Sequence, residues 1–600
     1  MWGINLESRA AGAVAIALAC TGCAEGGAAG AASKPAVVFP SRDEIARIPA
    51  EVPRAEAFGM ADVAVETWSF ESQASSDAAA YEDASPWGDV VRELVKAHPA
   101  NLTPSAPLKC AAQELARFHA KNGAMPTESL RRFVAARCGA VSSGITPMFW
   151  SVTSPIPISD AELAPKAGEG FAKRLGVRLQ TEHWLLGVAS AREGQRTSAV
   201  AVLARDEAKL EPGTLTVDAS RRVTLRGAAR GDFAEIGALV NRGDVGTAPC
   251  VPDPRVKAPR FALTCELAPG DTFAWVEVLG RRPGQLLLHE LAETIINEGD
   301  RSALVYAAHH VGPPATVKDG PAFSRSLLDG LNRVRTNAHM APLSLASEQS
   351  AENTRLAGTL VDAMISSDET VTNRAAIGLM AGWEVKGLIR NGNFFIAAVG
   401  TSDATAWLDF AIERPIGRSS LLDPAMRIIA IGPAIPPGGG ALGAAVTAYA
   451  LFETDDHSAD ATRFFGRVAA ARAARGLSAP VREPGFREMD AQLARIARAG
   501  GAPMDALQAT MRAAVARTGQ GVHGYTLETN DLDQVPVPEA LLAPVPMRMA
   551  IGVTHHRAEG AAWGQYVVMV VLLGRDEGMT AVQLGPHPVR FVAQRAPVVR

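Results

Sequence analysis

The feature that most constrains this fold is a stretch of sequence that the chain uses more than once. LLDPAMRIIAIG at residues 421–432 returns as LLAPVPMRMAIG at residues 541–552, so the closing glycines, at 432 and 552, stand 120 positions apart. A fainter third copy lies earlier, where LLGV at residues 185–188 leads through a charged turn into TSAVAVLARDE. Self-similarity of this kind is the signature of repeated structural units. We therefore expect three versions of one fold; the alternative is that short apolar runs simply look alike in an alanine-rich chain.

Each copy predicts a pair of buried strands. One apolar run precedes a polar or glycine-rich break, at residues 436–440 in one copy and 556–560 in the other, and a second apolar run follows it. The runs are nearly continuous in Ile, Val, Ala and Leu, which is typical of strands buried on both faces. Helices should then cover both sides of each sheet. The predicted fold class is α/β (α+β), with α-β-α sandwiches.

Length agrees with a multidomain chain. At about 150 residues per domain, 600 residues suggest about four domains. The gap between the first two copies leaves room for one additional module, and its apolar runs predict strands. The predicted organisation is a signal peptide at 1–23, a linker at 24–85, repeat 1 at 86–207, a β-rich insert module with a C-terminal helix at 208–320, repeat 2 at 321–455 and repeat 3 at 456–600.

Charge excludes one class of partner. The 59 basic and 63 acidic side chains give a formal net charge of −4. Such a balance provides no electrostatic footprint for nucleic acid. A small molecule, a peptide or an envelope protein remains as the expected partner.

The N-terminus predicts export. The apolar run at residues 10–20 is too short to span a bilayer and has the length of a signal-peptide core. Cys20-Thr21-Gly22-Cys23 resembles the lipoprotein box of bacteria, with Cys23 as the lipidated residue, which would make the N-terminal lipid the only membrane contact. Glu7 cancels the charge of Arg9 in this leader, so a misplaced start codon is an alternative. The expected location is the outer membrane or periplasm as a lipoprotein, or the medium as a secreted protein.

The remaining cysteines predict two disulfides. Cleavage before Cys23 leaves an even set of four thiols, which suits an oxidising compartment. Cys110 begins one predicted helix and Cys138 ends the next, and a tight turn between antiparallel helices brings such ends together. Cys250 and Cys265 bracket a proline-rich loop.

One motif approaches a zinc-peptidase signature. Residues 285–297 are predicted to be a helix that carries His289-Glu290-Leu291-Ala292-Glu293. A zinc peptidase needs a second histidine four positions after the first, where this chain has Glu293. We therefore expect Glu290 and Glu293 on a solvated helix face.

The ends of two predicted helices carry a family resemblance. LNRVRTNAHMAPLSL at 331–345 is echoed by VAAARAARGLSAPV at 468–481, with Arg335 matching Arg472. Together with LLDP and the terminal hairpin, this pattern resembles the CAP superfamily of cysteine-rich secretory, antigen 5 and pathogenesis-related proteins. The resemblance implies an α-β-α sandwich, in agreement with the buried strands. It also implies a cleft in which two histidines and two glutamates bind a divalent metal.

Repeat 2 departs from that metal site. Gly417-Arg418 stands before LLDP where the family pattern has a His-Arg pair, and no histidine occurs between His339 and His457. In repeat 3 the residue types that suit a metal or an acid–base pair are His523, Glu528, His555 and His556. The histidine pair also lies where exposed polar residues are expected beside a turn.

These observations favour binding over catalysis. The leading hypothesis is an exported, non-catalytic binding protein of the bacterial cell envelope that needs no cofactor and engages a lipid, peptide, glycan or envelope protein. The alternatives are a metal-dependent hydrolase that works with a divalent metal in repeat 3, and a structural envelope scaffold. Fold resemblance alone does not assign chemistry.

Overall fold

The computed structural model describes residues 81–573 with internal gaps, together with strands β1 (Ile16–Ala19) and β2 (Thr67–Trp68). The predicted lipidation residue Cys23 and most of the predicted signal peptide and linker lie outside the described residues. No helix in the described part of the chain has the length and apolar character of a membrane span. The chain divides into two compact units. Unit 1 holds the described residues up to 376 and from 393 to 448, and unit 2 holds residues 388–392 and those from 449 onward.

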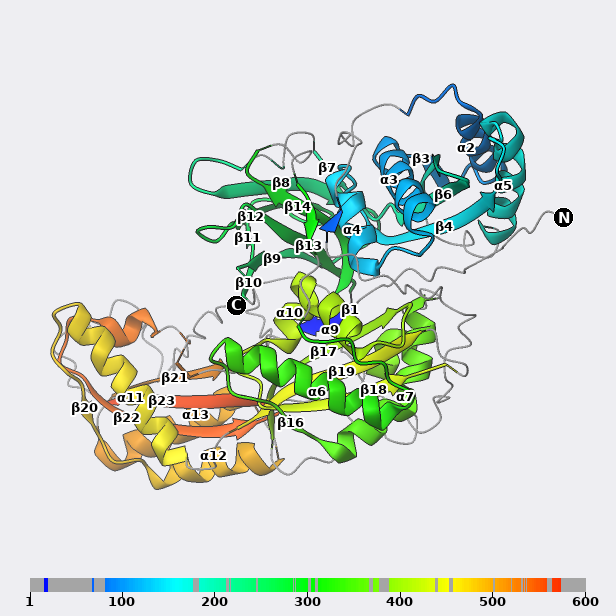
Figure 1. Ribbon diagram of the computed structural model, residues 1–600. Helices are drawn as coiled ribbons and strands as arrows, with labels where there is room; N and C mark the ends of the chain where they lie inside the picture. The colour runs from blue at the N-terminus through cyan, green and yellow to red at the C-terminus, as the bar shows by residue number, and fades with distance from the viewer. Residues whose placement is uncertain are drawn as a thin grey trace. The chain divides into compact units, whose positions relative to one another are not determined.

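The first α/β segment, residues 86–205, is a sheet covered by helices on both faces (Figure 1). Its strands lie in the order β3-β5-β6-β4. The apolar residues of α2 and α5 pack on one face of this sheet, and those of α3 and α4 pack on the other. The elements are α2 (Pro86–Ala97), β3 (Leu102–Pro104), α3 (Ala106–Asn122), α4 (Glu128–Arg137), β4 (Ser143–Thr153), α5 (Asp160–Leu175), β5 (Trp184–Glu193) and β6 (Arg196–Arg205).

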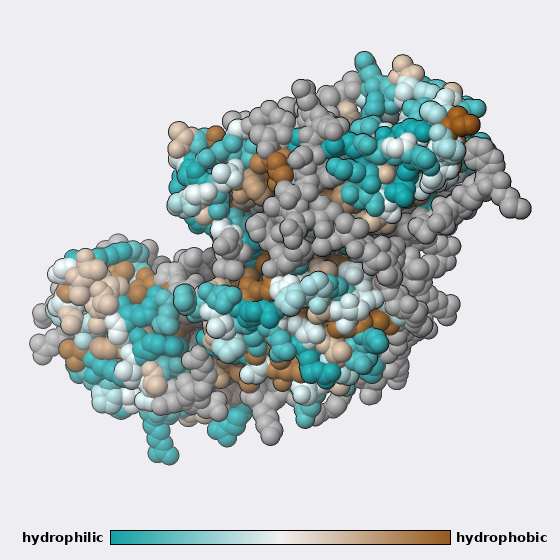
Figure 2. Space-filling model, in the orientation of Figure 1, coloured by the Kyte–Doolittle hydropathy of each residue, from teal (hydrophilic) through white to brown (hydrophobic). Residues whose placement is uncertain are grey.

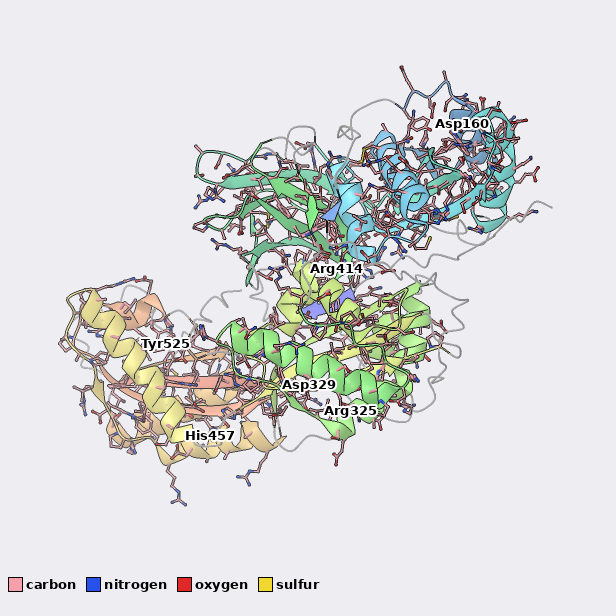
Figure 3. The ribbon with its side chains drawn as sticks, viewed as in Figure 1. Asp160, Arg325, Asp329, Arg414, His457 and Tyr525 are labelled. Carbon is pink, nitrogen blue, oxygen red and sulfur yellow. A yellow bond between two sulfur atoms is a disulfide. The ribbon has the colours of Figure 1, made fainter. Side chains whose placement is uncertain are left out.

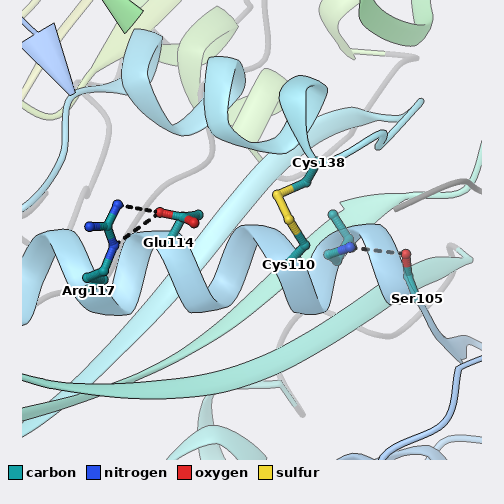
Figure 4. Close-up of a disulfide and its surroundings, with 6 residues drawn as sticks. Ser105, Cys110, Glu114, Arg117 and Cys138 are labelled. Carbon is teal, nitrogen blue, oxygen red and sulfur yellow. Dashed lines mark hydrogen bonds and ion pairs between the residues drawn. A yellow bond between two sulfur atoms is a disulfide. The ribbon is translucent and has the colours of Figure 1, made fainter. Parts of the chain in front are cut away.

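A disulfide joins the two helices on one face of this sheet (Figure 4). Cys110 lies in the first turns of α3 and Cys138 directly follows α4, with their Cα atoms 5.7 Å apart. Each helix begins at a hydroxyl cap: Ser105 Oγ accepts from the Leu108 amide, and Thr127 caps α4 in the same way. Capped helices joined by a short turn place the two cysteines side by side, as the sequence predicts.

The β module, residues 208–297, consists of two four-stranded sheets that enclose one core. The orders are β10-β9-β13-β14 and β11-β12-β8-β7. The Cys250–Cys265 disulfide is present, with Cα atoms 4.4 Å apart. The strands are β7 (Ala208–Leu210), β8 (Arg222–Ala229), β9 (Glu235–Arg242), β10 (Gly246–Pro249), β11 (Val251–Pro252), β12 (Arg260–Glu266), β13 (Phe273–Arg281) and β14 (His289–Asn297).

The helix predicted for residues 285–297 is wrong, because residues 289–297 form strand β14. Every residue of β14 is buried, and it pairs antiparallel with β13. A short buried run has no polar face, so periodicity cannot distinguish a strand from a helix. The β-branched run Thr294-Ile295-Ile296 favours the strand.

The second α/β segment, residues 320–451, has the sheet order β1-β17-β19-β18-β16. Helix α6 lies along this sheet (Figure 1) and packs, with α9 and α10, on its Phe395 and Ile431 face. Strand β15 (Tyr306–Ala307) precedes the segment and pairs with β2. The elements are α6 (Gly320–Asn337), β16 (Ser344–Leu345), α7 (Ser347–Ile365), β17 (Ile389–Val399), α9 (Ala404–Glu413), α10 (Pro415–Leu421), β18 (Ile428–Ala434) and β19 (Leu442–Leu451).

The third α/β segment, residues 457–573, has the sheet order β20-β22-β23-β21. Apolar residues of α11 and the η2 turn pack on one face, and those of α12 and α13 pack on the other. The elements are α11 (His457–Ala474), β20 (Val481–Arg482), α12 (Arg487–Ala499), α13 (Pro503–Thr518), β21 (Val522–Thr529), η2 (Glu539–Leu542), β22 (Arg548–His556) and β23 (Gln565–Leu573).

The three α/β segments share one strand order when the additional edge strand β1 is set aside. In each, a short first strand pairs in parallel with the third, and the fourth lies between the third and the second. The third strand of each segment also carries a glycine against a helix. A Cβ atom at Gly187 or Gly432 would lie 2.1 or 2.4 Å from the backbone of α3 or α7, and one at Gly552 would lie 2.4 Å from Leu493 of α12.

One buried arginine in the second segment and one in the third donate hydrogen bonds to backbone carbonyls of a loop. Arg335 is fully buried, and its guanidinium donates to the carbonyls of residues 341, 421, 423 and 426. Arg472 is equally buried and donates to those of residues 478, 541, 543 and 545. In both cases the first helix thereby holds the loop that leads into the third strand.

Candidate functional sites

A buried ionic cluster lies in unit 1 and includes the two glutamates of the zinc-peptidase-like motif. Glu277 on β13 is paired directly with Glu293 on β14, and a β-bulge between them and Glu290 places all three carboxylates together, within 4.8 Å of one another. Arg132 of α4 donates from Nε to Glu293 at 2.8 Å. Arg414, which directly precedes α10 (Figure 3), donates from Nε to Glu277 at 2.7 Å and also binds Glu290.

The expectation of a solvated helix face for Glu290 and Glu293 is therefore wrong. Both glutamates are buried, at 6% and 7% residue exposure. Their partners come from residues 161 and 124 positions away in the chain, so no local pattern reveals them. The available signal was that these two acidic positions lie in a segment that also contains the β-branched run Thr294-Ile295-Ile296.

The carboxylates of the cluster outnumber its guanidinium ions. Burial raises the pKa of Glu290 to about 7, against the opposing attraction of Arg414. Burial also acts on Glu293, but Arg132 outweighs it and lowers the pKa of that carboxyl. Arg132 also donates to Glu413 at 3.2 Å, so four carboxylates face two guanidinium ions. Burial raises the pKa of Glu277 as well as that of Glu290, so this pair of carboxyls is where the cluster holds a proton.

The cluster encloses very little space. The cavity beside it measures about 10 Å³, which is room for about one water molecule. The backbone amide of Ile416 also donates to Glu277 at 2.7 Å, which uses a further carboxylate oxygen. Two guanidinium ions among the carboxylates repel any added cation, so Glu277, Glu290 and Glu293 are unsuited to hold a metal. The arrangement joins the first segment, the β module and the second segment.

The structure does not bring the four predicted residues of repeat 3 together. His523 is the second residue of β21 and is exposed. It pairs with Leu572 of β23, which in turn pairs with Met549 near the start of β22. His555 and His556 end β22, with side chains on opposite faces because strand residues alternate. Glu528 shares the face of His556, where burial lowers the pKa of His556 and Glu528 opposes that shift.

Another group in unit 2 brings one of these residues into a candidate metal centre. His555 Nε2 lies 3.1 Å from Asp460 Oδ2, and both side chains are buried. His457 occupies the first position of α11 (Figure 3), and its ring meets that of His555 edge-on at 4.8 Å between centroids. The three residues offer ligand atoms within 4.8 Å of one another. The sequence analysis missed His457 and Asp460, although their i, i+3 spacing places both on one helix face.

The visible surface offers no comparable feature. On the face drawn in Figure 2, hydrophobic residues form small groups among hydrophilic ones. The large apolar side chains exposed in the described residues belong to different elements. They are Ile156, Val251, Val305, Leu345 and Val481. Single exposed apolar residues are normal on a soluble surface.

No protein-family model and no curated protein matches the chain. Among solved structures, the chain is similar to an extracellular protein containing an SCP domain from Bacillus anthracis str. Ames. The two share 14% identity at a TM-score of 0.17, over 41% of this chain and 89% of that chain. The proposals that follow rest on the geometry of this chain.

Proposed function

We propose that the protein is an exported, non-catalytic binding protein of the bacterial cell envelope, built from three divergent CAP-like domains and a β module. Its ligand is a lipid, peptide, glycan or envelope protein, bound at the surface of these domains. Cys23 carries its lipid anchor. The three domains correspond to the α/β segments described above.

Two features shared by all three segments, and a third shared by the second and third, support repetition of one domain. The segments have the same strand order, with a short first strand parallel to the third. Gly187, Gly432 and Gly552 each stand on the third strand against a helix, as the sequence alignment of the copies requires. Arg335 and Arg472 bind matching sets of carbonyls, whereas the first segment has Glu93 at the same distance from its first strand.

Two disulfides support export. Disulfides persist in oxidising compartments and are rare where thiols are kept reduced. Both bridges, Cys110–Cys138 and Cys250–Cys265, lie in buried surroundings within folded segments. The proposed compartment is therefore outside the cytoplasm.

The closed ionic cluster is the observation that carries the proposal of binding without catalysis. An active site needs its ionisable groups within reach of a substrate and a cavity to hold it. The carboxylates of this cluster are bound by arginines and adjoin space for about one water. Their chemistry is directed at holding segments together.

The test combines turnover and binding. The purified full chain is assayed against chromogenic esters, peptides, phosphoesters and glycosides, and against arrays of lipids, glycans and peptidoglycan fragments. We expect no turnover and saturable binding on an array. Turnover that disappears in Glu290→Gln would overturn the proposal, and so would turnover that disappears on chelation. The chelation result would favour the second candidate, a metal-dependent hydrolase, for which the grouping of His457, Asp460 and His555 is the supporting observation.

Lipid attachment has its own test. Cys23→Ser should release the chain from the membrane fraction and abolish incorporation of a labelled fatty acid, because it removes the proposed acylated thiol. Cys20→Ser is the matched control and should leave both unchanged. Release by the Cys20 variant alone would place the anchor on the other cysteine.

A further inference from the structure

We propose that unit 2 binds one Zn²⁺ ion through His457, Asp460 and His555. The site lies where the first turn of α11 meets the end of β22. It differs from the set His523, Glu528, His555 and His556 that the sequence suggests, with which it shares only His555. The proposal concerns metal binding and does not depend on the proposed absence of catalysis.

Two of the three donors are spaced nearly as at a bound ion, and the third lies within 4.8 Å of them. Two ligands of a tetrahedral zinc ion, each about 2.0–2.2 Å from the metal, lie about 3.3 Å apart. His555 Nε2 and Asp460 Oδ2 are 3.1 Å apart. Their hydrogen bond holds two donors at a separation that a metal can bridge, and replacement of the shared proton by Zn²⁺ would keep both side chains in place.

One ring nitrogen of the third ligand residue, His457, lacks a hydrogen-bond partner among the described residues. His457 Nδ1 is buried, and no hydrogen bond reaches it in the described residues. A buried polar atom without a partner costs about 1–3 kcal/mol unless something satisfies it. A metal shared with His555 and Asp460 would remove that cost. His457 itself is only partly buried, so the site has a path to solvent.

The surroundings fix the ligands as outer-shell groups do. Phe452 stacks on the His555 ring with centroids 4.1 Å apart, and Tyr566 meets the same ring edge-on at 4.8 Å. Arg463 donates to the other Asp460 oxygen, Oδ1, at 3.3 Å and also to the Tyr566 hydroxyl. This arginine weakens the local attraction for a cation, but it orients the carboxylate so that Oδ2 faces His555.

The donor types select the ion. Two imidazoles and one carboxylate, with a fourth position left for water, form a set typical of zinc. Mg²⁺ and Ca²⁺ prefer oxygen ligands and should bind weakly. Binding of one Zn²⁺ would release one proton from each of the two imidazoles that is protonated beforehand, because histidine ligates as the neutral ring.

The experiment titrates Zn²⁺ alone into the full chain, made without a histidine tag and stripped by a chelator. A chromophoric chelator competes for the metal, and elemental analysis gives the stoichiometry. We expect one tight site per wild-type chain. His457→Ala, His555→Ala and Asp460→Asn should each weaken that site by at least the 10–100-fold that loss of an outer-shell partner costs. His556→Ala, on the next residue and the opposite strand face, should leave it unchanged.

Folding is controlled within the same series. His457→Ala removes no hydrogen bond at Nδ1, so the metal-free variant should unfold at the wild-type temperature, while added Zn²⁺ should raise the unfolding temperature of the wild type only. No saturable binding by the wild-type chain, or equal affinity in the His457 and His556 variants, would overturn the proposal. Zinc binding without turnover leaves the proposed function intact, whereas zinc-dependent turnover would refute the non-catalytic function and retain the site.

Discussion

At the scale of single residues, the ionic cluster of unit 1 shows that the arginine partner of a buried carboxylate sets the direction of its pKa shift. Glu290 and Glu293 are three positions apart on one strand, yet their pKa values move in opposite directions. Glu293 faces Arg132, whose attraction outweighs desolvation, whereas Glu290 shares Arg414 with Glu277. The first behaves as a buried ion and the second as a buried acid.

Neutralising these glutamates should therefore have unequal effects. The pKa of Glu290 rises from 4.5 to about 7, so the folded state binds more protons and stability falls as the pH rises through that window. Glu290→Gln should abolish this fall, which amounts to at most about 3 kcal/mol, and should be at least as stable as wild type at pH 8. Glu293→Gln removes the main partner of Arg132 and should cost about 3–5 kcal/mol at neutral pH.

Urea unfolding from pH 4.5 to 8 measures both variants, and hydrogen exchange in residues 273–297 localises the effect. Glu298→Gln is the control, because Glu298 forms a half-exposed pair with Arg221 and should change little. An unchanged pH slope in Glu290→Gln would place the proton on Glu277, the other carboxyl whose pKa burial raises.

At the scale of elements, the third-strand glycines set how closely a helix approaches its sheet. A Cβ at Gly187 would lie 2.1 Å from backbone atoms of α3, and one at Gly432 would lie 2.4 Å from the backbone of α7. Backbone cannot move aside without displacing the helix. At Gly552 the obstacle is the end of the Leu493 side chain, which can change rotamer.

Alanine substitutions should reflect this difference. Gly187→Ala and Gly432→Ala should cost about 3 kcal/mol or more, and Gly552→Ala about 1 kcal/mol, since overpacking is relieved where a flexible side chain is the neighbour. Gly466→Ala, inside α11 with no atom near its added Cβ, should stabilise by about 0.5–1 kcal/mol. Thermal unfolding ranks the four, and Gly552→Ala as the most damaging would contradict the packing argument.

At the scale of the whole molecule, the repeated hairpins belong to separate cores. Ile431 is fully buried in the core of the second segment, and Ile551 is 6% exposed in that of the third. Because the hairpins lie in different sheets, each segment should unfold independently of the other.

Ile431→Asp and Ile551→Asp test this independence. Each places an unpaired carboxylate between helical layers, at a cost on the order of several kcal/mol against a domain stability of roughly 5–15 kcal/mol. We expect Ile551→Asp to expose only the third segment to protease and Ile431→Asp to leave that segment protected. Peptide mapping of the fragments measures both, and common unfolding of both segments would refute separate cores.

Structural features that depend on a repeated or local sequence pattern could be predicted from the sequence. The hairpins, the Arg335–Arg472 match and the cysteine pairs could all be found from spacing. Strand β14 could not, because a strand buried on both faces shows no alternation of polar and apolar residues. The ionic cluster and the His457 group were also beyond sequence reasoning, since each depends on residues that are about 95–160 positions apart and meet only in the fold.

The short first strand has a consequence for the order in which each segment folds. In the second segment Ser344 pairs with Ile428, and in the third Val481 pairs with Arg548. The first strand can therefore pair only after most of its segment has become available for folding. Such non-local pairing slows folding, because loop closure must precede any gain from contacts. A chain that crosses a membrane N-terminus first cannot complete the edge of any of these sheets until its third strand has emerged. On the proposed export route, each segment would leave the translocation channel as an incomplete sheet, and the interval before the sheet closes would be when the segment is most exposed to chaperones and proteases.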